Sequence, residues 1–348
     1  MRPMEEIRLT QFSHGAGCGC KISPAVLDSI LHSEIPKTSY VNLLVGNESK
    51  DDAAVFDLGD GTCIISTTDF FMPIVDDPFT FGSIASVNAI SDIYAMGGSP
   101  IMAIAILGWP LNKIPTHFAK SVLEGSRKIC EQAGIPLAGG HSIDCPEPVF
   151  GLAVTGKTEK QYLKRNNTAK AGSLLYLTKP LGVGITTTAQ KKGMVADNHM
   201  AIAISSMLKL NDLGAELGKL KCVSAMTDVT GFGLLGHLCE VCEGSGLSAV
   251  IDADRIPRFD FLNKYIEHKC IPGGTNRNWE SYGMKISSVT EEQRVLLADP
   301  QTSGGLLVMV DESEKENFEI HTLKHGYAMK PFGKLIPKES NVIIVQQS

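Results

Sequence analysis

Residues 63–96 read CIISTTDFFMPIVDDPFTFGSIASVNAISDIYAM, and this stretch decides the fold class. Residues 63–71 alternate in the manner of a strand with one buried face. In residues 81–96 apolar side chains recur every three or four positions, which predicts a helix. The strand ends near Asp69, and the helix that follows carries Asn88 and Asp92. A strand followed directly by a helix indicates a mixed α/β domain.

Strands and helices continue to alternate on the C-terminal side of this stretch. The further elements predicted in the first half are a helix at residues 116–133 and strands at 101–107, 136–138 and 149–154. The sequence GGHS, Gly139–Ser142, is expected to form a turn between two of these strands. The polar stretch from Lys157 to Lys170 indicates a domain boundary near residue 160.

The second half mixes the same two kinds of element. Strands are predicted at residues 174–182, 306–310 and 342–345, and residues 225–242 are expected to form a short strand, a turn and a helix. A chain of 348 residues is longer than a single hydrophobic core usually supports. We therefore predict two mixed α/β domains, 51–160 and 161–348, preceded by a mobile glycine-rich arm, 1–50.

Composition narrows the classes of function. The formal net charge is −6, which disfavours a nucleic-acid backbone or an anionic membrane as a partner. The longest apolar run, residues 101–111, is too short to span a bilayer, and the N-terminus lacks the apolar core of a signal peptide. Nine cysteines fit free thiols in a reducing compartment. We expect a cytoplasmic protein.

Aspartates provide the first chemical signal. Asp51, Asp52, Asp69, Asp92 and Asp228 lie in or beside glycine, threonine or asparagine turns, and carboxylate oxygens are suitable ligands for magnesium. Any one of them alone is as well explained as a turn or helix-capping residue, so the interpretation depends on the group. The sequence contains no GxxxxGK[ST] loop, so metal-bridging aspartates would have to hold any ATP phosphates.

The N-terminal segment HGAGCGCK, His14–Lys21, provides the second signal. Cys18 and Cys20 alternate with glycines, which makes them unlike ordinary core cysteines, and Lys21 could stabilise a thiolate or a phosphate. A zinc site shared with the CxxC of Cys239 and Cys242 is an alternative. A dinucleotide site is another, because residues 231–236 match GxGxxG after a predicted strand.

Seven motifs together resemble the selenophosphate synthetase family, also called selenide, water dikinase. In chain order they are HGAGCGCK, DDAAV, STTDFF, NAISDIYAMGG, AGGHSID, TDVTGFGLLGH and DPQTSGGLL, spanning residues 14–307. The resemblance implies a homodimer whose N-terminal domains pair their sheets into a barrel, with ATP bound near the interface. It also implies that ATP, selenide and water give selenophosphate, AMP and phosphate. The wider superfamily includes aminoimidazole ribonucleotide synthetase and thiamine monophosphate kinase.

The resemblance also assigns residues. It implies that Cys18 and Lys21 are the catalytic pair and that Asp52, Asp92 and Asp228 hold Mg²⁺. Its implied nucleotide contacts are Lys21, Ser49, Lys50, Asp51, Asp69, Asp92, Gly140, His141 and Ser142. A monovalent cation and a transient selenium-delivery protein are further expected partners. Two alternatives stay open: a kinase or ligase of the same superfamily that acts on a nitrogenous small molecule, and a thiol-based zinc or selenium carrier.

Overall fold

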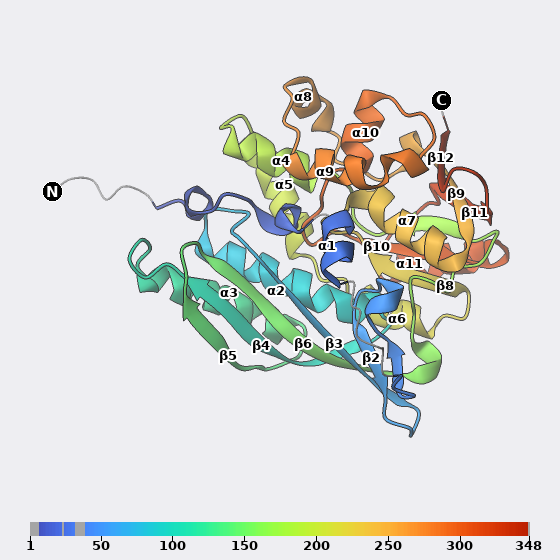
Figure 1. Cartoon of the computed structure of the whole chain (residues 1–348), viewed down its shortest axis with the longest axis horizontal. Coiled ribbons are helices and arrows are strands. Elements are labelled where there is room, and N and C mark those ends of the chain that lie inside the picture. Colours follow the sequence, from blue (N-terminus) through green and yellow to red (C-terminus); the bar gives the residue numbers. More distant parts are fainter. Residues whose placement is uncertain (1–6, 23, 32–38, 347–348) are drawn as a thin grey trace.

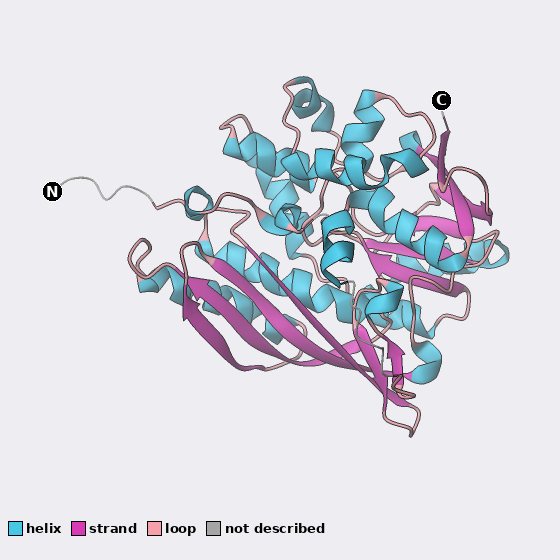
Figure 2. Ribbon diagram, in the orientation of Figure 1, coloured by secondary structure: helices cyan, strands magenta, loops and turns pink. Residues whose placement is uncertain are grey.

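The computed structural model describes residues 7–22, 24–31 and 39–346, and the side chains of Cys18, Cys20 and Ser49 lie outside this description. Within these residues the chain forms two six-stranded sheets, each covered by helices (Figures 1 and 2). The chain passes from the first sheet to the second between Glu159 and Leu174. The prediction of a mixed α/β fold is confirmed.

The N-terminal sheet has the strand order β1-β2-β3-β6-β4-β5. Its strands are β1 (Leu43–Val45), β2 (Ala54–Asp57), β3 (Thr62–Phe71), β4 (Ser99–Trp109), β5 (Leu137–Asp144) and β6 (Val149–Glu159). All neighbours pair antiparallel except β4 and β5, which are parallel. Residues 43–45, which the sequence analysis placed in the arm, thus belong to this sheet. The expected turn at Gly139–Ser142 is wrong, because these residues continue strand β5 along β4.

Two helices, α2 (Pro78–Ala95) and α3 (Thr116–Gln132), cover one face of this sheet (Figure 1). Helix α2 begins three residues before the predicted Phe81, because the Asp77 side chain accepts the N–H of Thr80 and Pro78 occupies the first turn. It contacts the N-terminal sheet on one side and α5, α6 and β8 of the second half on the other. This position explains why even its polar residues are buried.

The C-terminal sheet has the strand order β12-β9-β11-β7-β10-β8. Its strands are β7 (Leu174–Leu177), β8 (Val223–Asp228), β9 (Leu247–Asp252), β10 (Leu306–Val310), β11 (Gly333–Pro337) and β12 (Ile343–Gln346). Its pairs are antiparallel except β9 with β12. The remaining helices are α1 (Pro24–Leu31), α4 (Val183–Lys191), α5 (Asp197–Leu208), α6 (Leu213–Lys219), α7 (Gly233–Ser245), α8 (Leu262–Glu267), α9 (Gly273–Tyr282), α10 (Glu291–Leu297) and α11 (Lys315–Lys324).

The second domain is layered around its own sheet. Helices α6 and α11 enclose an apolar cluster with one part of the sheet, in which Leu217 and Phe318 pack with Tyr176 and Val308. Helix α7 contacts β8, β9 and β12. Strand β8 lies at the sheet edge and contacts α2, so Asp228 at its end faces the N-terminal domain. Among the described residues, no helix is long and apolar enough to cross a membrane.

Candidate functional site

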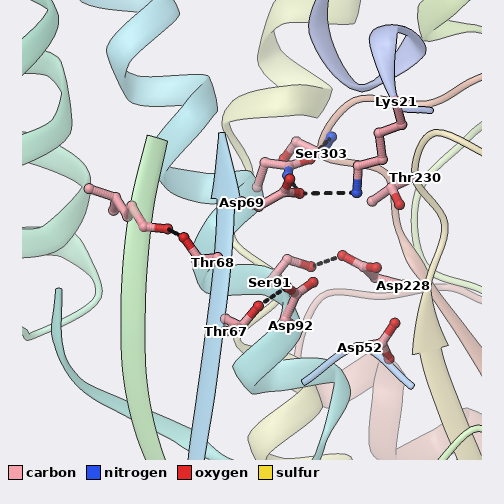
Figure 3. Close-up of polar contacts among 12 residues, drawn as sticks. Lys21, Asp52, Thr67, Thr68, Asp69, Ser91, Asp92, Asp228, Thr230 and Ser303 are labelled. Atoms are coloured by element: carbon pink, nitrogen blue, oxygen red, sulfur yellow. Dashed lines mark hydrogen bonds and ion pairs between the residues drawn. The ribbon is translucent and has the colours of Figure 1, made fainter. Parts of the chain in front are cut away.

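Three aspartates from separate parts of the chain meet at the junction of the two domains. Asp52 lies in the turn before β2, Asp92 lies on α2, and Asp228 is the last residue of β8. One carboxylate oxygen from each lies within 4.8 Å of the others (Figure 3). They stand 40 and 136 residues apart along the chain, so only the packing of α2 between the two sheets brings them together.

Burial and mutual repulsion make this group unfavourable without a cation. Loss of solvation and the charges of neighbouring aspartates raise the pKa of Asp52 and Asp92 well above the usual value, and burial also raises that of Asp228. The Oδ2 atom of Asp52 is buried and has no hydrogen-bond partner. Divalent cations such as Mg²⁺ bind carboxylate oxygens, and a bound cation would give this unpaired oxygen a partner and offset the repulsion among the three carboxylates. The residues therefore fit such an ion.

Hydroxyl groups fix the orientation of all three carboxylates. Ser91 donates to Asp228 Oδ2 at 2.6 Å and Thr67 donates to Asp92 (Figure 3). Thr227 donates to Asp52 Oδ1 at 2.8 Å. Each hydroxyl leaves the second oxygen of its partner available to a metal. None of these three residues was predicted from the sequence. Their positions could have pointed to them. Two of them directly precede a site aspartate in the sequence, and Thr67 lies on the same face of its strand as Asp69.

Lys21 of the arm and Asp69 of β3 lie at one side of the aspartate site. The Lys21 Nζ atom lies 3.4 Å from Asp69 Oδ2 (Figure 3). Asn88, which is fully buried on α2, donates to the same oxygen of Asp69 and accepts the N–H of Ser303 at 2.8 Å. Ser303 has a left-handed backbone (φ 51°), which its bonds to neighbouring groups offset. The loop at Ser303 thereby positions the carboxylate that holds Lys21.

The arm is docked against both domains in this structure. Gly17 donates its N–H to Met72 O at 3.0 Å, the Arg277 guanidinium donates to Gly19 O at 2.6 Å, and the Lys191 ammonium donates to Gly15 O at 3.0 Å. Gly17 has a left-handed backbone (φ 51°), and a Cβ there would meet the side chains of Thr302 and Ile74 at 2.4 and 2.5 Å, so both features favour glycine. Cys18 belongs to this docked segment, in the single turn Gly17–Cys20, while its side chain lies outside the described structure.

Asp51 lies next to the cluster but has different partners. Its carboxylate accepts the N–H of Asn166 at 3.2 Å, and Asn166 Nδ2 donates to Lys50 O at 2.8 Å. Burial raises the pKa of Asp51 to about 6. These bonds join the turn before β2 to the segment that connects the domains. Lys50 is exposed, and the Ser49 side chain is outside the description.

Gly140, His141 and Ser142 are not near this cluster within the chain. They lie on β5, at the sheet edge opposite to β1 and β2, and all three residues are exposed. The Asp52 turn precedes β2 at the other side of the sheet. A single chain therefore does not unite all of the residues expected to contact the nucleotide.

The fold contradicts the dinucleotide interpretation of residues 231–236. Strand β8 before this motif is an edge strand that pairs only antiparallel, with β10, whereas a dinucleotide fold needs parallel strands at that point. The glycines instead form a tight turn, in which Gly233 has φ 70° and His237 Nε2 accepts the N–H of Thr230 at 3.1 Å.

The CxxC pair is also a poor metal site. Cys239 and Cys242 lie on α7 and are buried in the hydrophobic core. Burial raises the pKa of Cys239 strongly and that of Cys242 to about 12. A metal-binding thiol must instead be easily deprotonated. The two residues are core side chains.

Comparison with known proteins agrees with the two-domain arrangement. Residues 50–158 match the family model for the AIR synthase related protein, N-terminal domain, and residues 170–346 match that for its C-terminal domain. Proteins named selenide, water dikinase are 58% identical in Colwellia psychrerythraea, 57% in Photobacterium profundum and 58% in Haemophilus influenzae. Each alignment covers 98% of this chain and 99% of the relative. The chain belongs to the selenide, water dikinase family. It is an enzyme of that family.

Solved structures share the fold at much lower identity. A thiamine-monophosphate kinase from Stenotrophomonas maltophilia superposes with a TM-score of 0.65 at 16% identity, over 88% of this chain and 92% of that one. The hydrogenase maturation protein HypE in complex with ATP superposes with a TM-score of 0.62 at 18% identity, over 85% of this chain and 84% of that one. At these identities the likeness shows the fold alone.

Proposed function

We propose that this protein makes selenophosphate: ATP, hydroselenide and water give selenophosphate, AMP and phosphate. The observation that carries the proposal is the meeting of Asp52, Asp92 and Asp228 between two domains, with Lys21 of the docked arm at the same junction. The family name supports selenide as the acceptor. The fold neighbour solved with ATP supports a nucleotide as the phosphoryl donor.

In this proposal Asp52, Asp92 and Asp228 hold Mg²⁺. Bound magnesium would neutralise the triphosphate and align the transferred phosphoryl group. Thr227, Ser91 and Thr67 keep the carboxylates oriented, so that little reorganisation is needed when the ions and the nucleotide arrive. Asp69 and Asn88 hold Lys21 at the edge of the site.

Lys21 and Cys18 act from the arm. The Lys21 ammonium group stabilises negative charge on the transferred phosphoryl group. Selenium donates an electron pair to the terminal phosphorus, the bond from that phosphorus to the bridging oxygen breaks, and ADP leaves; water then divides ADP into AMP and phosphate. Cys18 receives or positions the selenium atom. The docked arm also excludes water from the first transfer.

A homodimer would complete the nucleotide site. Gly140, His141 and Ser142 lie on an exposed edge strand, away from the aspartates of their own chain. The sheet face opposite to α2 and α3 exposes Phe56, Phe70 and Ile104, which is unusual for a free surface. Sheet-to-sheet pairing would bury these side chains and bring β5 of a second subunit toward the nucleotide of the first. Ser49 and Lys50 belong to the same proposed nucleotide contacts.

The cellular setting belongs to the same proposal. Seven described cysteines are free, which suits the reducing cytoplasm. A monovalent cation would add positive charge near the nucleotide, and a delivery protein would hand over selenide without releasing it. Loss of activity in sodium buffer and recovery in potassium buffer would support the monovalent cation.

The reaction is tested with purified protein, ATP, magnesium and hydroselenide under anaerobic conditions. We expect a phosphorus resonance coupled to selenium, together with AMP. Formation of ADP as the final nucleotide would instead indicate a simple kinase. Stoichiometric zinc in protein purified without added metal, with no nucleotide turnover, would indicate the carrier.

The metal assignment is tested by Asp52→Asn, Asp92→Asn and Asp228→Asn. Each should weaken ATP binding about tenfold or more when magnesium is present, and little when it is absent, because each removes one charged ligand. Asp60→Asn, in an exposed turn before β3, is the matched control. Unchanged ATP affinity in all three variants would show that the metal site lies elsewhere.

A further inference from the structure

We propose that a small cavity between the arm and helices α7 and α9 binds the hydroselenide anion before it attacks ATP; this inference rests on the proposed function. The cavity has a volume of about 10 Å³. Gly19 and Lys21 of the arm form one wall of it. The turn at Gly231 and the side chains of Arg277 and Asn278 on α9 are among the residues that form the others.

The charge of the cavity favours an anion. Lys21 and Arg277 line it, and none of the described residues around it is a carboxylate. Helices α7 and α9 both begin at its wall, and within the described structure neither has a side-chain N-cap. Their first-turn N–H groups add partial positive charge. In a protein of net charge −6, this local field contrasts with the neighbouring aspartate cluster.

The size of the cavity limits the class of ligand. About 10 Å³ is close to the least volume that holds one water-sized particle. Phosphate, carboxylic acids and nucleotides are too large, whereas hydroselenide has a single heavy atom. Arg277 is exposed, so rotation of its side chain would enlarge the cavity for the selenium atom, which is larger than a water oxygen.

Lys21 connects the cavity to the aspartate site. Its side chain lines the cavity, and its ammonium group lies 3.4 Å from Asp69, at the wall of the aspartate site (Figure 3). An anion in the cavity is therefore adjacent to the group that would meet the triphosphate. Two negative reactants repel each other, so a separate cationic pocket for the nucleophile lowers the cost of bringing them together.

The walls of the cavity are held in place by directed bonds. Asn278 Nδ2 donates to Gly231 O at 2.9 Å and to Ala298 O at 3.1 Å, which fixes α9 against the turn. The Arg277 guanidinium has five N–H donors, and Gly19 O accepts one of them at 2.6 Å. Arg277 thus closes the arm over the cavity and presents further donors to an anion.

The test compares Arg277→Gln, Arg277→Lys and the wild-type full chain. For Arg277→Gln we expect the KM for hydroselenide to rise about tenfold, the loss typical of one charge-assisted hydrogen bond, with the KM for ATP unchanged. Arg277→Lys keeps the positive charge, so its KM for hydroselenide should lie between those of the wild type and Arg277→Gln. Lys191→Gln is the matched control, because it removes a comparable cationic contact to the arm, at Gly15 O, without touching the cavity.

A binding measurement without ATP separates this inference from the proposed function. Trp279 adjoins Asn278 on α9, and Trp109→Phe leaves Trp279 as the only tryptophan. Hydroselenide should quench its fluorescence saturably, and Arg277→Gln should require about tenfold more anion. Linear quenching, equal effects of Arg277→Gln and Lys191→Gln, or a parallel rise in the KM for ATP would overturn the proposal. Saturable quenching without selenophosphate formation would refute the proposed reaction and retain the anion pocket.

Discussion

At the scale of single residues, the three aspartates at the domain junction lie in an unfavourable setting: Asp228 is buried, and Asp52 and Asp92 are half-buried beside it. Repulsion and lost solvation disfavour charge on Asp52, Asp92 and Asp228. The chemistry of these residues was visible in the sequence, where Asp52 and Asp228 adjoin turn-like segments and Asp92 lies on a predicted helix. The hydroxyl groups that orient them were not predicted, because a threonine or serine beside an aspartate is common and only the fold shows where it points.

Asp299 gives a prediction about pH at the same scale. It is fully buried, its carboxylate accepts the N–H of Gly184 at 3.0 Å, and burial raises its pKa to about 8. Between the ordinary pKa near 3.8 and this raised value, the folded state holds a proton that the unfolded chain has released. Stability therefore falls as pH rises through this range.

The variant Asp299→Asn lacks this titration and keeps a similar shape. We expect its Tm to match that of the wild type near pH 4 and to exceed it by about 2 °C or more near pH 9, measured by differential scanning calorimetry. Asp311→Asn is the control, because Asp311 is exposed and its pKa is lowered by Ser313. If the Tm difference between Asp299→Asn and the wild type did not change with pH, the raised pKa of Asp299 would be contradicted.

At the scale of elements, helix α2 determines the site. It carries Asn88, Ser91 and Asp92 on the turns that face β3 and β8, and nearly every other residue in it is buried. Its periodicity predicted a helix correctly. Its burial on all sides was not predicted, because the domain that covers its second side lies more than 70 residues further along the chain.

Close packing of α2 against α3 gives a prediction for these elements. A side chain at Gly82 would place its Cβ 1.9 Å from Val122 O, so the helices touch through backbone at that point. Gly82→Ala should lower the free energy of unfolding by about 1–3 kcal/mol by overpacking. Lys120→Ala, on the exposed side of α3, is the matched control and should change it by less than about 0.5 kcal/mol.

Urea unfolding followed by circular dichroism measures both variants. A Gly82→Ala protein as stable as Lys120→Ala would mean that α2 and α3 can separate without cost. Because α2 carries Asp92, the same variant should also weaken magnesium-dependent nucleotide binding.

At the scale of the whole molecule, one face of the N-terminal sheet is uncovered. Phe70 is 51% exposed and Ile104 is 45% exposed there, on neighbouring parts of the sheet. The glycine-rich strand β5 lies at the edge of the same sheet. The homodimer would use this face, and the residues on β5 would then complete the site of the other subunit.

The double variant Phe70→Glu, Ile104→Glu should convert the dimer to a monomer, because paired sheets would have to bury four new charges. Light scattering coupled to size-exclusion chromatography measures the mass, and we expect activity to fall with it. Leu323→Glu, at a side chain 60% exposed on α11, is the control for a charge added to an apolar surface elsewhere. A wild-type monomer that turns over normally would contradict the proposed dimer.

The sequence by itself determined the alternation of strands and helices, the acidic chemistry of the site and the family resemblance, because these depend on local periodicity and on motifs that are contiguous in the chain. The domain limits at residues 50 and 160 stay predictions. Tertiary structure alone decided that Gly139–Ser142 form a strand and that residues 231–236 follow an antiparallel edge strand, unlike the parallel strand of a dinucleotide fold, because strand pairing is set by distant partners. It also decided that three aspartates from two domains share one site, since their distance depends on how α2 packs between the sheets.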